Sequence, residues 1–123
     1  MNRSFSLRGG SEFQRVWDNG KSWSHPLLIL RCYANGTEVS RFGFVVGKKV
    51  GKAVKRNRAK RLMREAVRRR LKEIAKGWDV VFIARREAEQ AEFQAIDQAV
   101  ENLLRRARLY PISDPSTSLR TSL

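Results

Sequence analysis

The sequence predicts a single mixed α/β domain, in which short apolar strands and amphipathic helices follow one another along the chain. Three apolar runs have the length of a β-strand, and two longer segments repeat their apolar residues at helical spacing. The chain has 123 residues, of which 41% are hydrophobic. This length and composition fit one domain with a buried core.

The first element along the chain is a short helix over residues 11–20. Ser11 offers an N-cap, and Gln14 stands three residues later as its capping-box partner. Gly20 follows as a natural stop for the helix. One face of this helix carries the apolar residues Phe13, Val16 and Trp17.

Three strands are predicted at residues 27–33, 41–46 and 79–84. The first is a continuous apolar run, LLILRCY, and Asn35-Gly36 gives a turn signal after it. In the second strand the side chains alternate between the two faces of the sheet. Alternation groups Phe42, Phe44 and Val46 on one face and Gly43 and Val45 on the other.

Two longer helices are predicted, one from Ala53 to before Gly77 and one over residues 89–108. The apolar stripe of the first comprises Ala59, Leu62, Met63, Ala66, Val67 and Ile74. The second stripe comprises Phe93, Ile96, Val100, Leu103, Leu104 and Ala107. Each helix is therefore amphipathic: it packs one face against a core and leaves the other face exposed.

The two ends of the chain lack such patterns. Residues 1–10 include two glycines and no periodicity, so we expect a flexible arm there. Residues 111–123 contain two prolines and many serines and threonines, which predicts a disordered tail. The domain should therefore occupy residues 11–110.

The net charge of +14 predicts a polyanionic partner. In the densest segment, residues 42–68, the basic residues are opposed only by Glu65. Such a run is usually a solvated surface, but this one lacks acids at i,i+4 spacing and is rich in arginine, which grips phosphate bidentately. It also lacks the exposed aromatic residues of a helix that lies on a membrane. We therefore expect nucleic acid as the partner.

The residues give no constellation for independent catalysis or for a protein-bound metal. His25 is the only histidine, and no cysteine or second histidine lies near it to complete a metal site. Cys32 is the only cysteine, and its apolar surroundings are typical of a small buried residue. No secretory leader and no apolar run of about 20 residues is present, which predicts a cytoplasmic protein.

Two features stay open from the residues alone. Asn57, among the arginines, could cap a helix, reach a base or contact a metal-bound water. Phe13, Trp17, Phe42 and Phe44 are most simply core residues, but some of them could form a stacking platform for single-stranded RNA.

The segment GKKVGKAVKRNRAKRLMREAVR resembles the signature of the bacterial ribonuclease P protein subunit. In that family a Lys-Lys pair and a glycine lead into an Arg-Asn-Arg helix, which continues as Lys-Arg-x-x-Arg. The matching residues are Lys48-Lys49, Gly51, Arg56-Asn57-Arg58, and Lys60-Arg61 with Arg64. SEFQRVW and DVVFIAR resemble neighbouring segments of the family, and the resemblance covers residues 5–110.

The resemblance implies the order helix–strand–strand–strand–helix–strand–helix around a small mixed sheet. It also implies a left-handed β-α-β crossover through the basic helix, whereas the general rule would predict a right-handed one. The implied function is auxiliary: an RNA subunit uses Mg²⁺ to remove the 5′ leader of precursor tRNA. The protein binds no metal itself and needs no membrane and no obligate protein partner.

The resemblance also assigns residues to two RNA-binding regions. The RNA-facing set is Lys48, Lys49, Arg56, Asn57, Arg58, Lys60, Arg61, Arg64 and Arg68. A cleft between the first helix and the sheet holds the single-stranded leader, with Phe13, Trp17, Arg31, Phe44 and Val46 as candidates. Arg31 departs from many members of the family, which place an aromatic residue near that position. A ribosomal-RNA- or DNA-binding protein and an autonomous ribonuclease are the competing hypotheses.

Overall fold

The structure, a computed structural model, describes residues 6–7 and 10–112. Its main elements are α1 Gly10–Asn19, β1 Lys21–Ser24, β2 Leu28–Ala34, β3 Arg41–Val46, α2 Ala53–Arg68, β4 Trp78–Ala84 and α3 Phe93–Arg106. Three short 3-10 helices lie between them, η2 Lys48–Val50, η3 Leu71–Glu73 and η4 Arg86–Gln90. The predicted class and the order α-β-β-β-α-β-α are both confirmed.

The four strands form one mixed sheet in the order β1-β2-β4-β3. β2 pairs antiparallel with both β1 and β4, whereas β3 and β4 are parallel. Parallel neighbours need a crossover connection, and the chain makes it through α2. The left-handed sense of this crossover stays a prediction of the resemblance.

The residue pattern alone does not predict β1. Its sequence is KSWS, in which Trp23 is the only apolar residue, and most of the strand is exposed. Pairing with β2, from Lys21 opposite Cys32 to Ser24 opposite Ile29, forms the strand despite this polar sequence. Pairing with the neighbouring apolar strand has therefore outweighed the low strand propensity of these residues.

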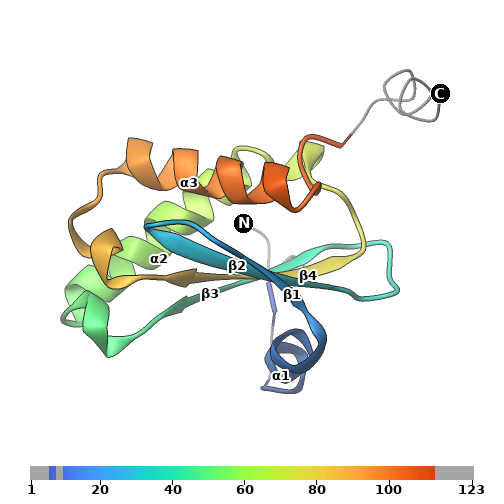
Figure 1. Cartoon of the computed structure of the whole chain (residues 1–123), viewed down its shortest axis with the longest axis horizontal. Helices are drawn as coiled ribbons and strands as arrows, with labels where there is room; N and C mark the ends of the chain where they lie inside the picture. Colours follow the sequence, from blue (N-terminus) through green and yellow to red (C-terminus); the bar gives the residue numbers. More distant parts are fainter. Residues whose placement is uncertain (1–5, 8–9, 113–123) are drawn as a thin grey trace.

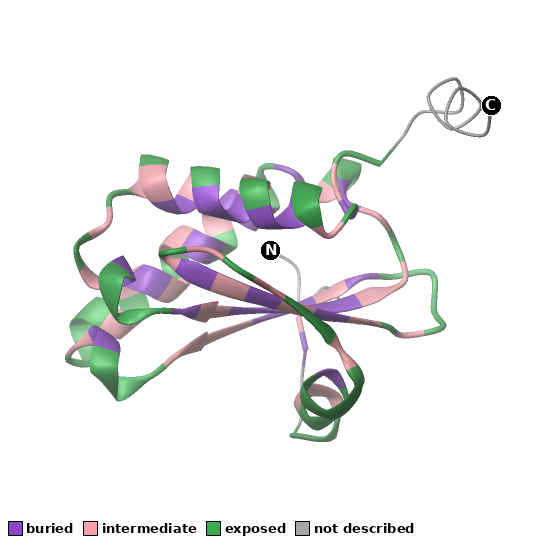
Figure 2. Ribbon diagram, in the orientation of Figure 1, coloured by how far each residue is buried: buried purple, intermediate pink, exposed green. Residues whose placement is uncertain are grey.

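The sheet lies between two helical layers of unequal size (Figure 1). α2 and α3 cover one face, and the shorter α1 lies against the other. The main core, which includes Phe42, Met63 and Phe82, lies between the sheet and the two long helices. A smaller cluster under α1 consists of Leu7, Val16 and Val81. Figure 2 shows the outer sides of the helices exposed, and the small α1 leaves part of its sheet face uncovered.

Both long helices are shorter than predicted. α2 ends at Arg68, and Arg70 then turns inward and donates a hydrogen bond to the carbonyl oxygen of Ala66. The segment continues as η3, which still delivers Ile74 to the core. α3 begins only at Phe93, because the residues before it form η4 and an extended N-cap.

The predicted capping box of the first helix is wrong, and its predicted end is right. Ser11 lies inside α1, and the Gln14 amide donates to Asp18 at 2.8 Å instead of reaching back to the helix start. α1 ends at Asn19, and Gly20 follows in close contact with the carbonyl oxygen of Val16. A side chain at position 20 would collide with that oxygen, so the stop requires glycine.

Three residues of the expected arm, Ser6, Leu7 and Gly10, have defined positions, and Gly10 belongs to α1. Ser6 forms a parallel bridge with Phe42, and the Leu7 amide donates to the Phe42 carbonyl oxygen at 2.9 Å. Leu7 is buried in the cluster under α1. Pro111 and Ile112 of the expected tail are also described, whereas residues 1–5, 8–9 and 113–123 lie outside the described residues.

Candidate nucleic-acid interface

The basic surface consists of η2 and the part of α2 that does not pack on the core. It comprises the nine residues predicted to face RNA, Lys48, Lys49, Arg56, Asn57, Arg58, Lys60, Arg61, Arg64 and Arg68. The opposite side of α2 buries Ala59, Met63, Ala66 and Val67, so the helix is amphipathic as predicted. With 3.6 residues per turn, Asn57, Arg61, Arg64 and Arg68 follow one exposed line along it.

Most cations of the basic surface have no acidic partner among residues 6–7 and 10–112. The exception is Arg68, which pairs with Glu65 on its own helix. The neighbouring Lys55 pairs with Glu89 at 3.2 Å. Unpaired cations of one sign repel one another, and the phosphates of a nucleic acid would remove that repulsion. The surface therefore has the electrostatics of a polyanion-binding site.

Two arginines of the basic surface are held by the protein itself. Arg58 donates a hydrogen bond to the carbonyl oxygen of Ala91 at 3.1 Å, and this contact joins α2 to the segment before α3. The guanidinium of Arg64 lies 5.5 Å from the ring centroid of Phe44 on β3. These contacts fix the direction of both side chains, which favours binding at a defined position.

A groove runs from α1 across the open face of the sheet. Its first part, of about 340 Å³, is lined by Gly10, Phe13, Gln14, Trp17 and Val45. Its second part, of about 750 Å³, also includes Val45 and reaches Ile29, Ile83, Lys48, Lys49, Arg85 and Arg86. We call these two parts together the α1 groove.

The α1 groove is apolar in its middle, and at one end four cations outnumber the single carboxylate, that of Glu87. Ile29, Val45 and Ile83 form the apolar sheet surface, and the Trp17 ring is 44% exposed at the α1 end. Exposed rings can stack on unpaired bases, while cations contact the phosphates between them. The groove therefore suits a single-stranded nucleic acid.

Two arginines fix α1 to the sheet on either side of the groove. Arg41 donates to Glu12 at 2.6 Å and to the fully buried Asp79 at 2.8 Å. The hydrogen bond to Asp79 is the main reason why the pKa of Arg41 is raised. At the other end of α1, Arg31 donates to the Trp17 carbonyl oxygen at 2.6 Å and lies over the Trp17 ring.

The distance between α1 and the sheet depends on Gly43. A Cβ atom at this position would lie 2.5 Å from Cζ of Phe13, closer than side chains tolerate. The Phe13 ring therefore lies directly on the backbone of β3. Glycine, which has no Cβ, is the residue that permits this close approach.

The structure does not bring the five predicted leader-cleft residues together. Phe13, Trp17 and Arg31 lie on the α1 side of the sheet. Phe44 and Val46 point to the opposite face and pack against the main core, with Phe44 stacked on Phe82. A cleft between α1 and the sheet cannot include them, because alternate residues of a strand face opposite ways.

The residue pattern missed part of the groove. Alternation groups Val45 with Gly43 but indicates no function for it. Ile83 on β4 lies opposite Val45 in the sheet, and Ile29 on β2 lies opposite Ile83. Arg85 and Arg86 directly follow β4, so the only feature of the sequence that could have indicated them is a pair of cations at the end of a strand. Which sheet face lies open depends on where the helices pack, and the sequence does not show this.

The described residues hold no group of three His, Cys, Asp or Glu that could bind a metal ion. The His25 ring accepts a hydrogen bond from the Leu27 amide, and its pKa is lowered by burial and by Arg106. This arrangement stabilises a turn and suggests no catalytic role. In the same part of the chain, no helix has the length and apolarity needed to cross a membrane.

Comparisons of sequence and of structure with known proteins identify the same family. The family described as Ribonuclease P matches residues 1–108. The ribonuclease P protein component of Herpetosiphon aurantiacus is 46% identical over 110 residues, which span 89% of each chain. That of Dehalococcoides mccartyi is 39% identical over 121 residues, 98% of this chain and 99% of the relative.

Two solved structures share the fold. The RNase P protein of Staphylococcus aureus superposes with a TM-score of 0.81 at 28% identity, covering 86% of this chain and 97% of that chain. The RNase P protein of Thermotoga maritima gives a TM-score of 0.76 at 35% identity, with 82% and 96% covered.

Proposed function

The chain belongs to the ribonuclease P protein family, and on this basis we propose that it binds two RNAs in the ribonuclease P assembly. The basic surface binds the catalytic RNA, and the α1 groove binds the single-stranded 5′ leader of precursor tRNA. The protein is auxiliary, and the RNA subunit hydrolyses the bond that releases the leader.

The observation that carries this proposal is the position of η2 between the two surfaces. Lys48 and Lys49 belong to the basic surface and also line the basic end of the α1 groove. A strand in the groove would therefore reach the catalytic RNA at this end. Binding of the leader away from the reacting bond adds affinity for the substrate without any chemistry by the protein.

Mg²⁺ enters the proposal as an ion of the RNA subunit. Among the described residues no three acidic, histidine or cysteine side chains group together to hold it, and the carboxylates of Asp79, Asp97 and Glu101 are already hydrogen-bonded to arginines. The protein lowers the repulsion between two polyanions, and so do divalent ions. The benefit of adding the protein should therefore be largest at low Mg²⁺.

The first experiment incubates precursor tRNA with the protein, with ribonuclease P RNA, and with both at low Mg²⁺. Cleavage should be fast only when both are present. Cleavage by the protein alone would instead support an autonomous ribonuclease. If the protein bound RNA but did not increase cleavage, a ribosomal-RNA- or DNA-binding protein would be the better assignment.

A second experiment tests the α1 groove. Trp17→Ala should weaken binding of long-leader precursor tRNA to the holoenzyme by about 1–3 kcal/mol, the effect of losing one stacked base. The same change should have little effect on a substrate whose leader is too short to reach Trp17. Gln98→Ala, at an exposed position on α3, is the control. Equal losses for both leaders would show that Trp17 does not contact the leader.

A further inference from the structure

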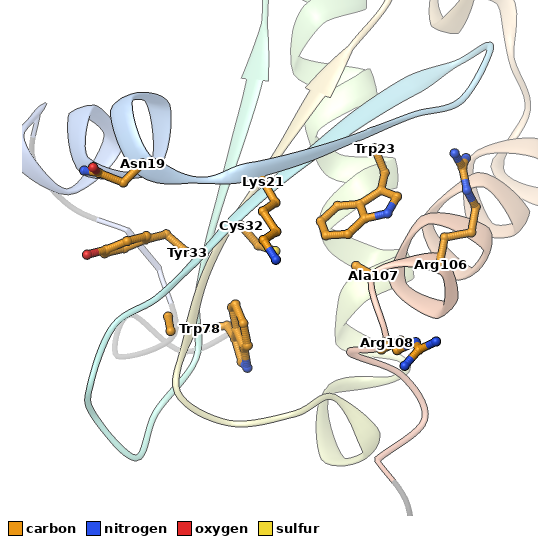
Figure 3. A pocket seen from close by; sticks show the side chains of 10 residues that line it. Asn19, Lys21, Trp23, Cys32, Tyr33, Trp78, Arg106, Ala107 and Arg108 are labelled. Carbon is orange, nitrogen blue, oxygen red and sulfur yellow. The ribbon is translucent and has the colours of Figure 1, made fainter.

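We propose that a third site, the α3-end pocket, binds one unpaired nucleotide of an RNA. The pocket lies between the C-terminal end of α3 and the β1–β2 side of the sheet (Figure 3) and has a volume of about 460 Å³. The base would contact Trp23 and Trp78, and the phosphate would contact Lys21 and Arg108. The choice of RNA as the source of the nucleotide rests on the proposed function.

The pocket is distinct from the surfaces already described. Trp23, Cys32 and Trp78 belong to or pack against the main core, on the sheet face that carries α2 and α3. The α1 groove lies on the opposite face. No residue of the basic surface or of the α1 groove lines the pocket.

The two tryptophans supply the aromatic walls. Trp23 comes from β1 and Trp78 from the start of β4, and Figure 3 shows the side chains of Lys21 and Cys32 between their rings. Within the described residues, neither indole stacks on a ring or a cation, and neither N–H donates a hydrogen bond. Both rings are therefore available to a ligand, and base–aromatic stacking tolerates any base.

The charged residues that line the pocket favour an anionic ligand. Its lining contains Lys21, Arg106 and Arg108 and no carboxylate. Arg106 donates to the Ser24 carbonyl oxygen at 2.7 Å, whereas Lys21 and Arg108 form no ion pair with any described residue. Aromatic walls alone would also suit a quaternary ammonium ion, but three cations would repel one. A flat ring that carries a phosphate satisfies both features.

The backbone at Arg108 supports a functional role for its side chain. Its φ is 60°, in the left-handed region where helices usually place glycine after their last turn. The Leu109 amide donates to the Leu104 carbonyl oxygen at 2.9 Å, which completes this helix end. A residue with a side chain costs roughly 1 kcal/mol more than glycine in this conformation. The chain keeps arginine at this position despite the cost, and the arginine contributes a cation to the lining of the pocket.

The floor of the pocket is neutral. Cys32 is buried, and burial raises the pKa of its thiol to about 11, so no thiolate opposes a phosphate. Ala34 and Ala107, which also line the pocket, are small and take up little of its volume. The volume lies within the range of about 300–1,000 Å³ found for small-molecule sites, which suits one nucleotide.

The experiment uses the three indole N–H signals in ¹H–¹⁵N spectra of the full chain, assigned with Trp→Phe variants. AMP should shift the signals of Trp23 and Trp78 with a common saturation curve. Adenosine, which lacks the phosphate, should bind at least about tenfold more weakly, and inorganic phosphate should not reproduce the shifts. A shift of Trp17 alone, equal effects of phosphate and AMP, or no saturation would each overturn the proposal.

Arg108→Gly separates binding from folding. Glycine suits the positive φ, so the variant should be as stable as the original chain or more stable, while its affinity for AMP falls about tenfold. Lys72→Ala, which removes an exposed cation outside the pocket, should bind AMP normally. Unchanged affinity of Arg108→Gly would overturn the assignment of the phosphate.

A last experiment tests whether an RNA supplies the nucleotide that the pocket binds. In an active holoenzyme, RNA that contains photoreactive 4-thiouridine should form crosslinks to peptides with Trp23 or Trp78. Normal cleavage of precursor tRNA with no such crosslink would overturn the third site and leave the proposed function intact. If the protein failed to stimulate cleavage when the RNA contained no 4-thiouridine, that result would instead count against the proposed function.

Discussion

The cations in the first turns of α2 and those just past its end differ in what they contact. Arg56, Lys60 and Arg61 have no acidic partner among the described residues. Arg70 is buried, and it meets Asp97 at 2.6 Å and Glu101 at 3.0 Å on α3. Both groups belong to one continuous basic run.

The difference shows that a basic run does not by itself define an interface. The acids that neutralise Arg70 come from α3, far along the sequence, and dock there when α3 packs on α2. Near the start of α2, Glu89 pairs with Lys55, but Arg56, Lys60 and Arg61 receive no such acidic neighbour among the described residues. The first group is therefore suited to bind a partner, and the second group joins two helices.

The largest expected effect comes from breaking the paired group. Arg70→Ala should destabilise the fold by about 1.5–3 kcal/mol, the range for a lost hydrogen bond to a charged group, because Asp97 and Glu101 lose their buried partner and keep only the exposed Arg69 and Arg105. Urea unfolding measures the loss. Arg69→Ala is the matched control, since Arg69 also contacts Asp97, at 3.3 Å, but its side chain is 51% exposed. It should cost less than about 1 kcal/mol, and similar losses for both would contradict the comparison.

Removing the unpaired group should affect RNA binding and spare the fold. The triple change of Arg56, Lys60 and Arg61 to alanine should lower the slope of log K against log salt by about 2–3 units, or 0.7–0.9 per lost phosphate contact. Stability should stay equal or rise, because repulsion falls. Titration of ribonuclease P RNA at several salt concentrations gives the slope, and an unchanged slope would remove these residues from the interface.

A smaller effect distinguishes two exposed arginines on the same line of α2. Arg61→Ala should weaken RNA binding about tenfold, the effect of one charged hydrogen bond. Arg68→Ala should weaken it less, because Arg68 already pairs with Glu65. Competition binding with one labelled RNA measures both, and a larger effect for Arg68 would reverse the ranking.

The smallest effect is a dependence of stability on pH. Hydrogen bonding to Arg70 is the main cause that lowers the pKa of Asp97 below its ordinary value of 3.8. A lowered pKa gives stability above the unfolded-state value, and this stability is lost as the pH falls through the folded-state value. Unfolding measured between about pH 5 and pH 2 should therefore show a shallower acid loss in Asp97→Asn than in the original chain. Identical acid slopes would count against the pair.

The sequence was sufficient for features that depend on local spacing. The amphipathic pattern of α2 and the alternation around Gly43 follow from helix and strand periodicity, and both agree with the structure. Features set by distant packing were not predictable. These include the early end of α2 and the separation of Phe44 from Trp17 by the sheet.

The contact between Gly43 and Phe13 sets the height of the α1 groove. Glycine is the smallest residue, so α1 already lies at its lowest possible position above β3. A substitution at position 43 would force the Phe13 ring to move, either by swinging aside or by lifting α1. Either movement would reshape the part of the α1 groove that Phe13 lines, although position 43 is not among the residues that line the groove.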